Sequence, residues 1–226
     1  YNARADFSPI VETEFRALAQ GDQDLYSDLF DPEEQARQEA RGDIFPIAAQ
    51  IYDLGGDTPK VSNVHLLGDN AEVEINFDYE GQPYRRLENL RRVDGLWRIT
   101  RALFPVWGET VSIEEANVTV TFRERDAFLS EHIAQIEEIA QFFCQRYQLP
   151  EPCQLDLAIQ PDGDWPPSVP DDYAGSLSIV SPRLIGVSGD EPHPLWWSSL
   201  REAVAVTMAR RNGVERVKRI TSPVAN

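Results

Sequence analysis

The side chains best suited to bind metals are scarce in this sequence of 226 residues and lie far apart. The three histidines, His65, His132 and His193, have no second ligand at the helical spacing that common zinc motifs use. The two cysteines, Cys144 and Cys153, do not form a Cys-x-x-Cys pair. This inventory predicts no metal site and no cofactor.

Carboxylates are plentiful, but their spacing does not favour acid–base catalysis. They occur as direct neighbours, such as Glu137 and Glu138, and adjacent side chains on a helix or strand point apart. The aspartate-rich loop of residues 162–172 could hold calcium, but its three prolines and the lack of a suitably spaced Glu favour a solvated loop. Since the sequence also lacks a Gly-x-Ser-x-Gly elbow and a Walker loop, it indicates no catalytic residues.

The cysteine pair has a structural interpretation. Cys144 lies late in a helical pattern and Cys153 opens a strand pattern, so the two can approach within disulfide reach. Two free thiols in a reducing cytosol are the alternative. We expect the disulfide, and with it an extracytoplasmic location, either secreted or membrane-anchored.

The net charge limits the possible partners. Lys and Arg number 21 and Asp and Glu number 38, which gives a formal net charge of −17. Such a chain repels nucleic acids and anionic membranes, and it has no apolar stretch of about 18 residues that could span a bilayer. Only residues 201–226 reverse the sign, either as a solvated helix end or as a site for an anionic partner.

Hydrophobic spacing predicts helices first and strands afterwards. Ser8-Pro9 is typical of a helix start, and so is Asp31-Pro32-Glu33-Glu34, in which Asp31 would cap the helix. This order predicts an α+β fold in which helices cover one face of a curved antiparallel sheet. The strands are expected over residues 61–67, 71–79, 84–93 and 96–103.

The last predicted hairpin carries a family resemblance. Its sequence Leu90-Arg91-Arg92-Val93-Asp94-Gly95-Leu96-Trp97-Arg98-Ile99 resembles the final hairpin of the nuclear transport factor 2-like superfamily, which includes ketosteroid isomerase and polyketide cyclase-like proteins. The resemblance covers about residues 6–108. It implies a cone-shaped α+β domain with a pocket enclosed between the sheet and the helices.

The alternation of residues 71–79 predicts which side chains face that pocket. Every carboxylate of this strand has the outward parity, so the inner face is expected to be apolar. Only a tyrosine or a histidine could then act as a polar group inside. The predicted pocket-lining residues are Val73, Ile75, Phe77, Tyr79, Trp97, Ile99, His65 and Tyr52.

A second, smaller α+β domain is predicted over residues 112–220. The order of its elements resembles the N-terminal lobe of zincin metallopeptidases of the gluzincin kind, in which the last helix carries His-Glu-x-x-His. The expected elements are a strand at 118–122, a helix at 128–147, strands at 155–159, 176–180 and 184–187, and a helix at 194–211.

The peptidase motif is degenerate at the matching place, Arg201-Glu202-Ala203-Val204-Ala205. Only Glu202 agrees with the family pattern, because Arg201 and Ala205 stand where the two histidine ligands would be. Neither a guanidinium nor a methyl group binds zinc. The resemblance therefore implies a pseudo-peptidase, a zincin-like lobe without its metal.

These observations favour a non-catalytic binding or interaction module in the extracytoplasmic region of a larger bacterial protein. Its partner would be an unknown protein or a small apolar ligand. Trp165 and Trp196-Trp197 could either contact such a partner or cover the core. The alternative is an enzyme of the isomerase, cyclase or dehydratase type that acts on a small apolar molecule in the cone pocket.

A homodimer through the outer face of the sheet is a further possibility. That face carries the acidic side chains Glu72, Glu74 and Asp78, which would repel a second copy of themselves. Self-association is therefore expected only if nearby arginines pair with this row. The candidates are Arg85, Arg86, Arg91 and Arg92.

Overall fold

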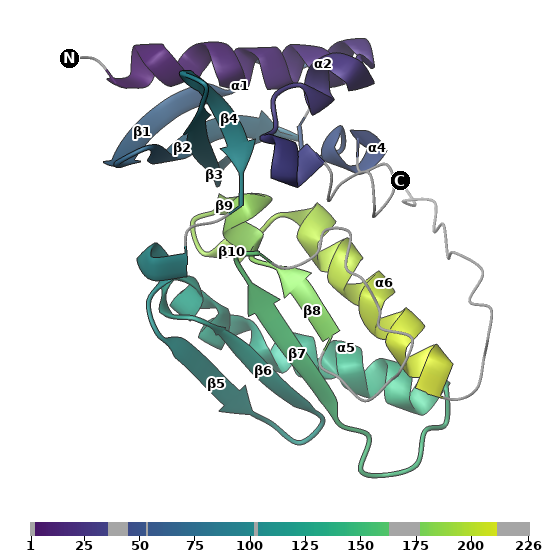
Figure 1. The fold of residues 1–226 in the computed structure, drawn as a ribbon. Coiled ribbons are helices and arrows are strands. Elements are labelled where there is room, and N and C mark those ends of the chain that lie inside the picture. Colours follow the sequence, from purple (N-terminus) through teal and green to yellow (C-terminus); the bar gives the residue numbers. More distant parts are fainter. Residues whose placement is uncertain (1–2, 36–44, 53, 102–103, 163–176, 212–226) are drawn as a thin grey trace. The chain divides into compact units, whose positions relative to one another are not determined.

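The computed structural model describes residues 3–35, 45–52, 54–101, 104–162 and 177–211 of the chain (Figure 1). As predicted, the fold is α+β, with N-terminal helices and an antiparallel sheet A, and a second, mixed sheet B with helices. None of the helices within these ranges is long and apolar enough to cross a membrane. The chain divides into two compact units: unit 1 contains Tyr1–Val106 and Ser181–Trp196, and unit 2 contains Trp107–Val180 and Trp197–Asn226.

Unit 1 begins with helix α1, Ala3–Gln20, followed by α2, Gln23–Ser27, and α4, Phe45–Ala48. Helix α1 starts before the Ser8-Pro9 start that the sequence predicts, so Pro9 lies inside it. Proline removes a backbone donor, so α1 loses the hydrogen bond that an N–H at position 9 would donate to the carbonyl of Ala5. The helix continues through Pro9 despite this loss.

The predicted cap at Asp31 is confirmed. Its Oδ1 accepts a hydrogen bond of 2.9 Å from the backbone N–H of Glu34, and the backbone oxygen of Asp31 accepts one from Gln35. These bonds satisfy donors at the start of a helical turn that would otherwise lack partners.

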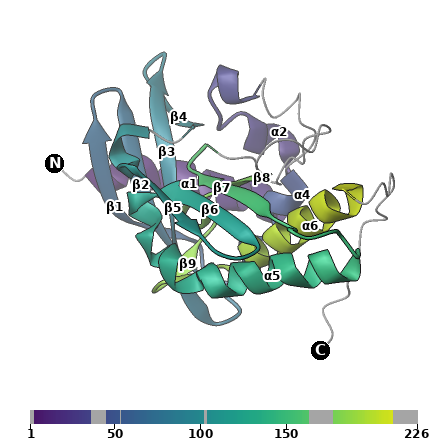
Figure 2. The ribbon, with the colours of Figure 1, turned by 90° about the horizontal axis from the view of Figure 1, so that it is seen from below.

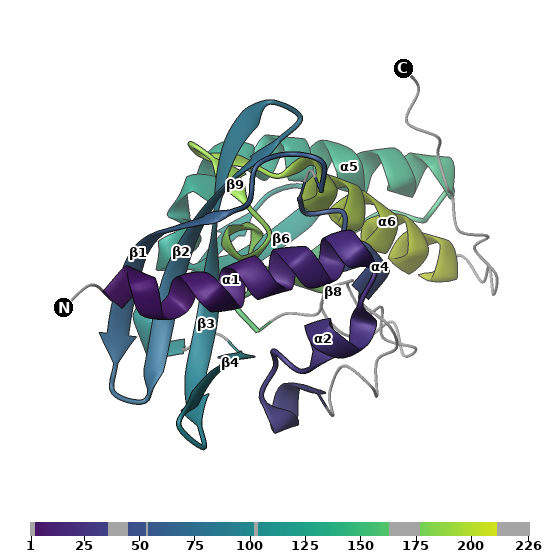
Figure 3. The same cartoon turned by 90° about the horizontal axis from the view of Figure 1, so that it is seen from above.

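The first four strands of sheet A form the predicted antiparallel meander, and two short strands from later in the chain, β9 and β10, extend it. Neighbouring strands run β1-β2-β3-β9-β10, and β4 also pairs with β3. The turns at Glu80-Gly81 and Asp94-Gly95 have positive φ at both residues, which suits tight hairpins. Helix α1 lies across the strands (Figure 3). The bounds are β1 Lys60–Leu67, β2 Asn70–Tyr79, β3 Gln82–Val93, β4 Leu96–Thr100, β9 Val187–Ser188 and β10 Glu191–Pro192.

The segment Ser181–Trp196 belongs to unit 1, although the sequence analysis placed it in the second domain. Its strand β9 pairs with β3, with Val187 opposite Arg85. The strand predicted at residues 184–187 is largely wrong, because Pro182–Leu184 forms a 3₁₀ helix. The Ser181 hydroxyl accepts a hydrogen bond of 3.2 Å from the N–H of Arg183, which favours this turn over an extended chain.

In unit 2, sheet B has the strand order β5-β6-β7-β8. Strands β5 and β6 are antiparallel, whereas β6 and β7, and β7 and β8, are parallel. Strand β5 was not predicted, although Val111 and Ile113 alternate with polar residues along it. The bounds are β5 Thr110–Glu114, β6 Val118–Arg123, β7 Leu155–Gln160 and β8 Leu177–Val180.

Two helices accompany sheet B. Helix α5, Ile133–Arg146, packs against β6 (Figure 2), and α6, Pro194–Arg211, matches its predicted bounds. The helix predicted over residues 128–147 starts as an α-helix only at Ile133, because Glu124–His132 forms a kinked 3₁₀ segment. The kink lies at Asp126, whose side chain is fully buried, so local packing overrides the helical periodicity there.

Candidate functional site

The predicted inner face of β2 is buried. Val73 and Ile75 have no exposed surface, and Phe77 is 5% exposed. Of the other predicted pocket-lining residues, Ile99 and Tyr52 are also buried, Tyr79 and Trp97 are half-buried, and His65 is exposed.

Ring contacts bring some of these residues together and leave others apart. The rings of Tyr52 and Phe77 meet at right angles, with their centroids 5.1 Å apart. Trp97 instead contacts Phe7 of helix α1, at 5.0 Å. That these residues line one pocket stays a prediction.

Charged side chains lie on the same inner face, which the sequence analysis expected to be apolar. Arg86 and Glu88 of β3 stand directly opposite Ile75 and Val73 of β2, so they share the buried side of the sheet. Glu14 reaches this side from helix α1. The three are 6%, 5% and 3% exposed, respectively. We call Glu14, Arg86 and Glu88 the ionic cluster.

The ionic cluster is held by one guanidinium group. Nη2 of Arg86 donates to Oε2 of Glu14 and also to Oε1 of Glu88, at 3.3 Å in the second case. The hydroxyl of Tyr52 donates to the same Glu14 oxygen at 3.2 Å, and the Arg86 guanidinium carbon lies 5.3 Å from the centre of the Tyr52 ring. Two carboxylates thus share one cation away from water.

The shared cation leaves one carboxylate protonated. Burial, together with the nearby charge of Glu14 and against the attraction of Arg86, raises the pKa of Glu88 to about 8. Burial opposes the charge of Arg86, but Glu14 and Glu88 raise the pKa of Arg86 above its ordinary value. The raised pKa favours a proton on Glu88 at neutral pH.

Two buried atoms of the ionic cluster make no hydrogen bond within the described part of the chain. They are Oε2 of Glu88 and Nε of Arg86. A buried carboxylic acid with a raised pKa can in principle donate or accept a proton in a reaction. Glu88 thus gives the inner face of sheet A a chemical capability beyond packing.

The sequence did contain a signal for the ionic cluster. Glu14 follows Val11 by three residues and precedes Leu18 by four, so it lies on the apolar face of its helix. Arg86 and Glu88 have the same parity as the buried Tyr84 and Leu90 of β3. The analysis of residues 71–79 alone could not show this, because the charges come from α1 and β3.

A groove of about 420 Å³ opens at the other end of sheet A in unit 1. It lies where β1 begins, β2 ends and β3 begins, and the β9–β10 turn contributes to its wall. Of the predicted pocket-lining residues, only Phe77 lines it. The complete lining is Asp57, Thr58, Lys60, Asn76, Phe77, Asp78, Pro83, Tyr84, Arg85, Val187, Ser188 and Gly189.

On the inner face of sheet A, the rings of the lining residues Phe77 and Tyr84 contact His193, which is fully buried. The rings of Phe77 and Tyr84 are stacked 5.8 Å apart, and His193 lies 4.8 Å from Tyr84. Nδ1 of His193 accepts a hydrogen bond of 3.1 Å from the N–H of Leu195. Burial lowers the pKa of His193 to about 4, so the ring is neutral and structural at physiological pH.

The degenerate peptidase motif of unit 2 lies on helix α6. Arg201 and Glu202 are exposed, whereas Ala205 is 4% exposed. No group of three or more His, Cys, Asp or Glu side chains is placed to hold a metal ion in the described residues. Trp196 and Trp197 are buried, which fits the interpretation that they cover the core, and Trp165 lies outside the described residues.

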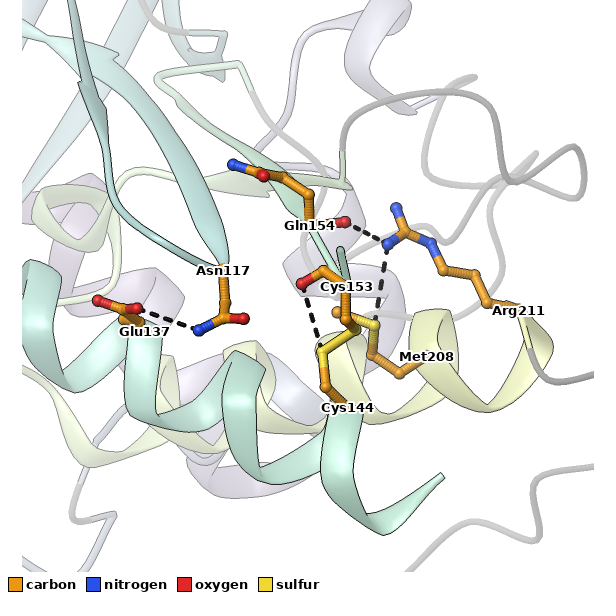
Figure 4. The surroundings of a disulfide bond; sticks show 7 residues. All are labelled: Asn117, Glu137, Cys144, Cys153, Gln154, Met208 and Arg211. Atoms are coloured by element: carbon orange, nitrogen blue, oxygen red, sulfur yellow. Dashed lines mark hydrogen bonds between the residues drawn. A yellow bond between two sulfur atoms is a disulfide. The ribbon is translucent and has the colours of Figure 1, made fainter. Parts of the chain in front are cut away.

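The predicted disulfide between Cys144 and Cys153 is present (Figure 4). It joins the end of α5 to the start of β7, across a Cα–Cα distance of 6.1 Å. Beside it, Arg211 donates a hydrogen bond to the backbone oxygen of Gln154, so the last residue of α6 is fixed to the same strand (Figure 4).

The outer face of sheet A has fewer arginines available for a homodimer than the sequence suggested. Arg86 is turned inward, and Arg91 pairs with Asp31 and Glu33 at 3.2 Å. Arg85 approaches the acidic row, at 3.9 Å from Glu74. A homodimer through this face remains a prediction.

No protein-family model matches this chain, and no curated protein matches it either.

Proposed function

We propose that this chain is a non-catalytic binding module. The observation that carries the proposal is the groove of unit 1, whose volume of about 420 Å³ lies in the usual range for small-ligand sites. Its lining includes charged and amide side chains, which can fix the orientation of a ligand. The ionic cluster supports the same proposal, because its charges are paired with one another and stabilise the packing of α1 on sheet A.

We further propose that the module works in an oxidising, extracytoplasmic compartment. The disulfide supports this location, since such bonds persist outside the reducing cytosol.

The family resemblances are part of the proposal. Antiparallel sheet A with helix α1 across it supports a nuclear transport factor 2-like unit 1. The mixed sheet with α5 and α6 supports a zincin-like unit 2, and Arg201 and Ala205 argue against zinc binding there. Added zinc is therefore expected to produce no peptidase activity, which a fluorescent casein assay with and without zinc would check.

The experiment for the binding function is a ligand screen by NMR on the ¹⁵N-labelled full chain. The library should contain neutral, anionic, cationic and zwitterionic compounds. We expect ligands to shift amide signals of residues 57–60, 76–78 and 187–189, and to be recovered unchanged. Turnover of a compound, or binding confined to other residues, would refute the proposed function.

One observation favours the alternative of an enzyme. Oε2 of Glu88 is buried, lacks a hydrogen-bond partner within the described residues, and belongs to a carboxyl group with a raised pKa. Such a group could move a proton on a small apolar substrate of an isomerase, cyclase or dehydratase. A screen of small carbonyl and hydroxy compounds against wild type and Glu88→Gln tests this alternative. An activity of wild type that is lost in the variant would support the enzyme. If wild type turns over none of the compounds, the binding module is the supported function.

A further inference from the structure

Strand β1 gives sheet A a long free edge. It lies at the outer side of the sheet (Figure 3), where it pairs with β2 and with no other strand of the described residues. At the opposite end of the sheet, β10 has two residues, and its Pro192 has no N–H to offer. Strand β1 is eight residues long, and the unpaired N–H and C=O groups along such an edge can bind a further strand.

The free backbone groups of this edge include those of Val64 and Leu66. Leu67 and Asn70 close the two-residue turn at Gly68-Asp69, so they hydrogen-bond to each other. In an antiparallel pair, residues that bond to the neighbouring strand alternate with residues that do not. Counting back from Leu67, the N–H and C=O groups of Leu66 and Val64 are therefore directed away from β2.

An apolar row on the inner face of sheet A ends exposed at the same edge. Leu90 of β3 lies between Ala71 of β2 and Ile99 of β4 in this row, and all three are at most 5% exposed. Leu66 of β1 continues the row opposite Ala71, but it is 44% exposed. A further strand beside β1 would cover part of Leu66, as the neighbouring strands do for the rest of the row.

The charges at the two ends of β1 make this edge complementary to itself. The strand has no acidic residue and starts at the cation Lys60, whereas the anion Asp69 lies in the turn beyond its other end. Within the described residues, no ion pair joins Lys60 or Asp69 to another side chain. A second copy of this acidic chain therefore meets less repulsion at β1 than at the carboxylates on the outer face of β2.

The backbone groups and the apolar row fit one symmetric register. When His65 of each copy lies on a two-fold axis, Val64 of one copy is directly opposite Leu66 of the other. Each of these two pairs can exchange two backbone hydrogen bonds, which makes about four in total. Leu66 then packs beside Val64 of the second copy, and the apolar row continues across the axis.

The same register also pairs the charges. Lys60 and His65 are four positions apart along the edge, because a bulge between Val61 and Asn63 absorbs one residue. Asp69 lies four residues beyond His65 in the other direction. Lys60 of each copy is therefore directly opposite Asp69 of the other copy.

We propose that this chain forms a homodimer in which the β1 strands of two copies pair antiparallel and join their sheets A into one. A closed two-fold pair uses both free edges, so the assembly stops at the dimer. The contact is short, which makes the dimer weak and reversible. This interface is separate from the outer face of sheet A, and it adds an assembly to the proposed binding function.

The test is sedimentation equilibrium on the full chain up to about 500 µM, a range that detects weak interfaces. We expect wild type to dimerise reversibly. Leu66→Lys should weaken the dimer at least about tenfold, because it places a charge in the apolar contact on each side of the axis. The matched control is Leu96→Lys, which changes a leucine of β4 that is 59% exposed and separated from β1 by two strands. It should dimerise as wild type does.

An exchange of charges tests the register. Lys60→Asp or Asp69→Lys alone should weaken the dimer about tenfold, because like charges then face each other at both ends of the interface. The double variant restores opposite charges and should recover most of the lost affinity. The proposed dimer is wrong if wild type stays monomeric at every concentration, if Leu66→Lys dimerises as strongly as wild type, or if the double variant is as weak as the single ones.

Discussion

Glu14 and Glu88 reach the same guanidinium from different elements, and this sharing determines the charge of the buried site. Arg86 can neutralise one carboxylate fully, so the second is stable inside unit 1 only when it holds a proton. The pKa of Glu88 is raised to about 8, against an ordinary value of 4.5. The folded protein therefore binds this proton more tightly than the unfolded chain does.

This difference predicts how stability depends on pH. The contribution of Glu88 is complete below about pH 4.5 and is lost as the pH rises through about 8. Between these values the free energy of unfolding should fall by up to about 1.4 kcal/mol per pH unit because of this one group. Glu88→Gln, which mimics the protonated acid, should remove that slope and be the more stable form at pH 9. Urea unfolding at pH 5 to 9 measures both.

A matched control for the pH experiment is Glu12→Gln, which alters an exposed carboxylate on α1, the helix that carries Glu14. It should keep the slope of wild type. If Glu88→Gln also keeps that slope, Glu88 is ionised at neutral pH and the charge assignment is wrong.

A second residue-scale prediction concerns Arg86. Arg86→Met should destabilise unit 1 by about 3–5 kcal/mol, because it leaves the charge of Glu14 buried without its cation. Adding Glu14→Gln should recover a large part of that loss, since the stranded charge is then gone. Urea unfolding of the two single variants and the double variant measures this coupling. Additive losses would show that Glu14 and Arg86 do not depend on each other.

At the scale of elements, hydrophobic alternation and turn residues predicted the strands and turns that depend on neighbouring residues alone. The alternation of residues 71–79 identified β2 and its buried face, and Asp94-Gly95 identified the turn between β3 and β4. The same patterns place Glu14, Arg86 and Glu88 on buried faces, but their pairing exists only once α1 lies across β3. The kink at Asp126 and the 3₁₀ turn at Pro182 likewise depend on burial and capping that periodicity does not report.

The close approach of Gly186 to Phe77 in unit 1 predicts a stability difference between two glycines. At Gly186, with φ of 152°, a Cβ atom would lie 2.9 Å from Phe77, whereas at Gly189, with φ of 62°, it would meet nothing within 4 Å. Both Ala variants strain the backbone, but Gly186→Ala adds an overlap worth about 1–3 kcal/mol. It should therefore lower the melting temperature more than Gly189→Ala in calorimetry. Equal shifts would mean that Phe77 moves aside freely.

At the scale of the whole molecule, we expect the disulfide to stabilise the unit that contains it. Replacing Cys144 and Cys153 with Ser should destabilise unit 2 by about 2–3 kcal/mol, because the open loop of about ten residues gains entropy in the unfolded state. Hydrogen exchange should become faster in α5 and β7 while the amides of sheet A keep their protection. Faster exchange throughout the chain would show that the two units unfold together.

Only part of the division into two units could be predicted from the sequence. A break near residue 107 follows from the composition of Phe104-Pro105-Val106-Trp107-Gly108, and unit 1 ends its first segment at Val106. The return of Ser181–Trp196 to unit 1 depends on the pairing of Val187 with Arg85, about a hundred residues away. Pairing over such a distance leaves no short-range pattern in the chain.

This return has a consequence for the order of biosynthesis. A ribosome that has released the chain as far as Val106 has made helix α1 and strands β1 to β4, but not β9 or His193. All four strands of sheet B are then synthesised before the β9–β10 turn can reach β3. The groove is therefore among the last features of unit 1 to form, and a nascent or truncated chain that stops short of Val187 lacks part of the groove wall even where its first four strands have already paired.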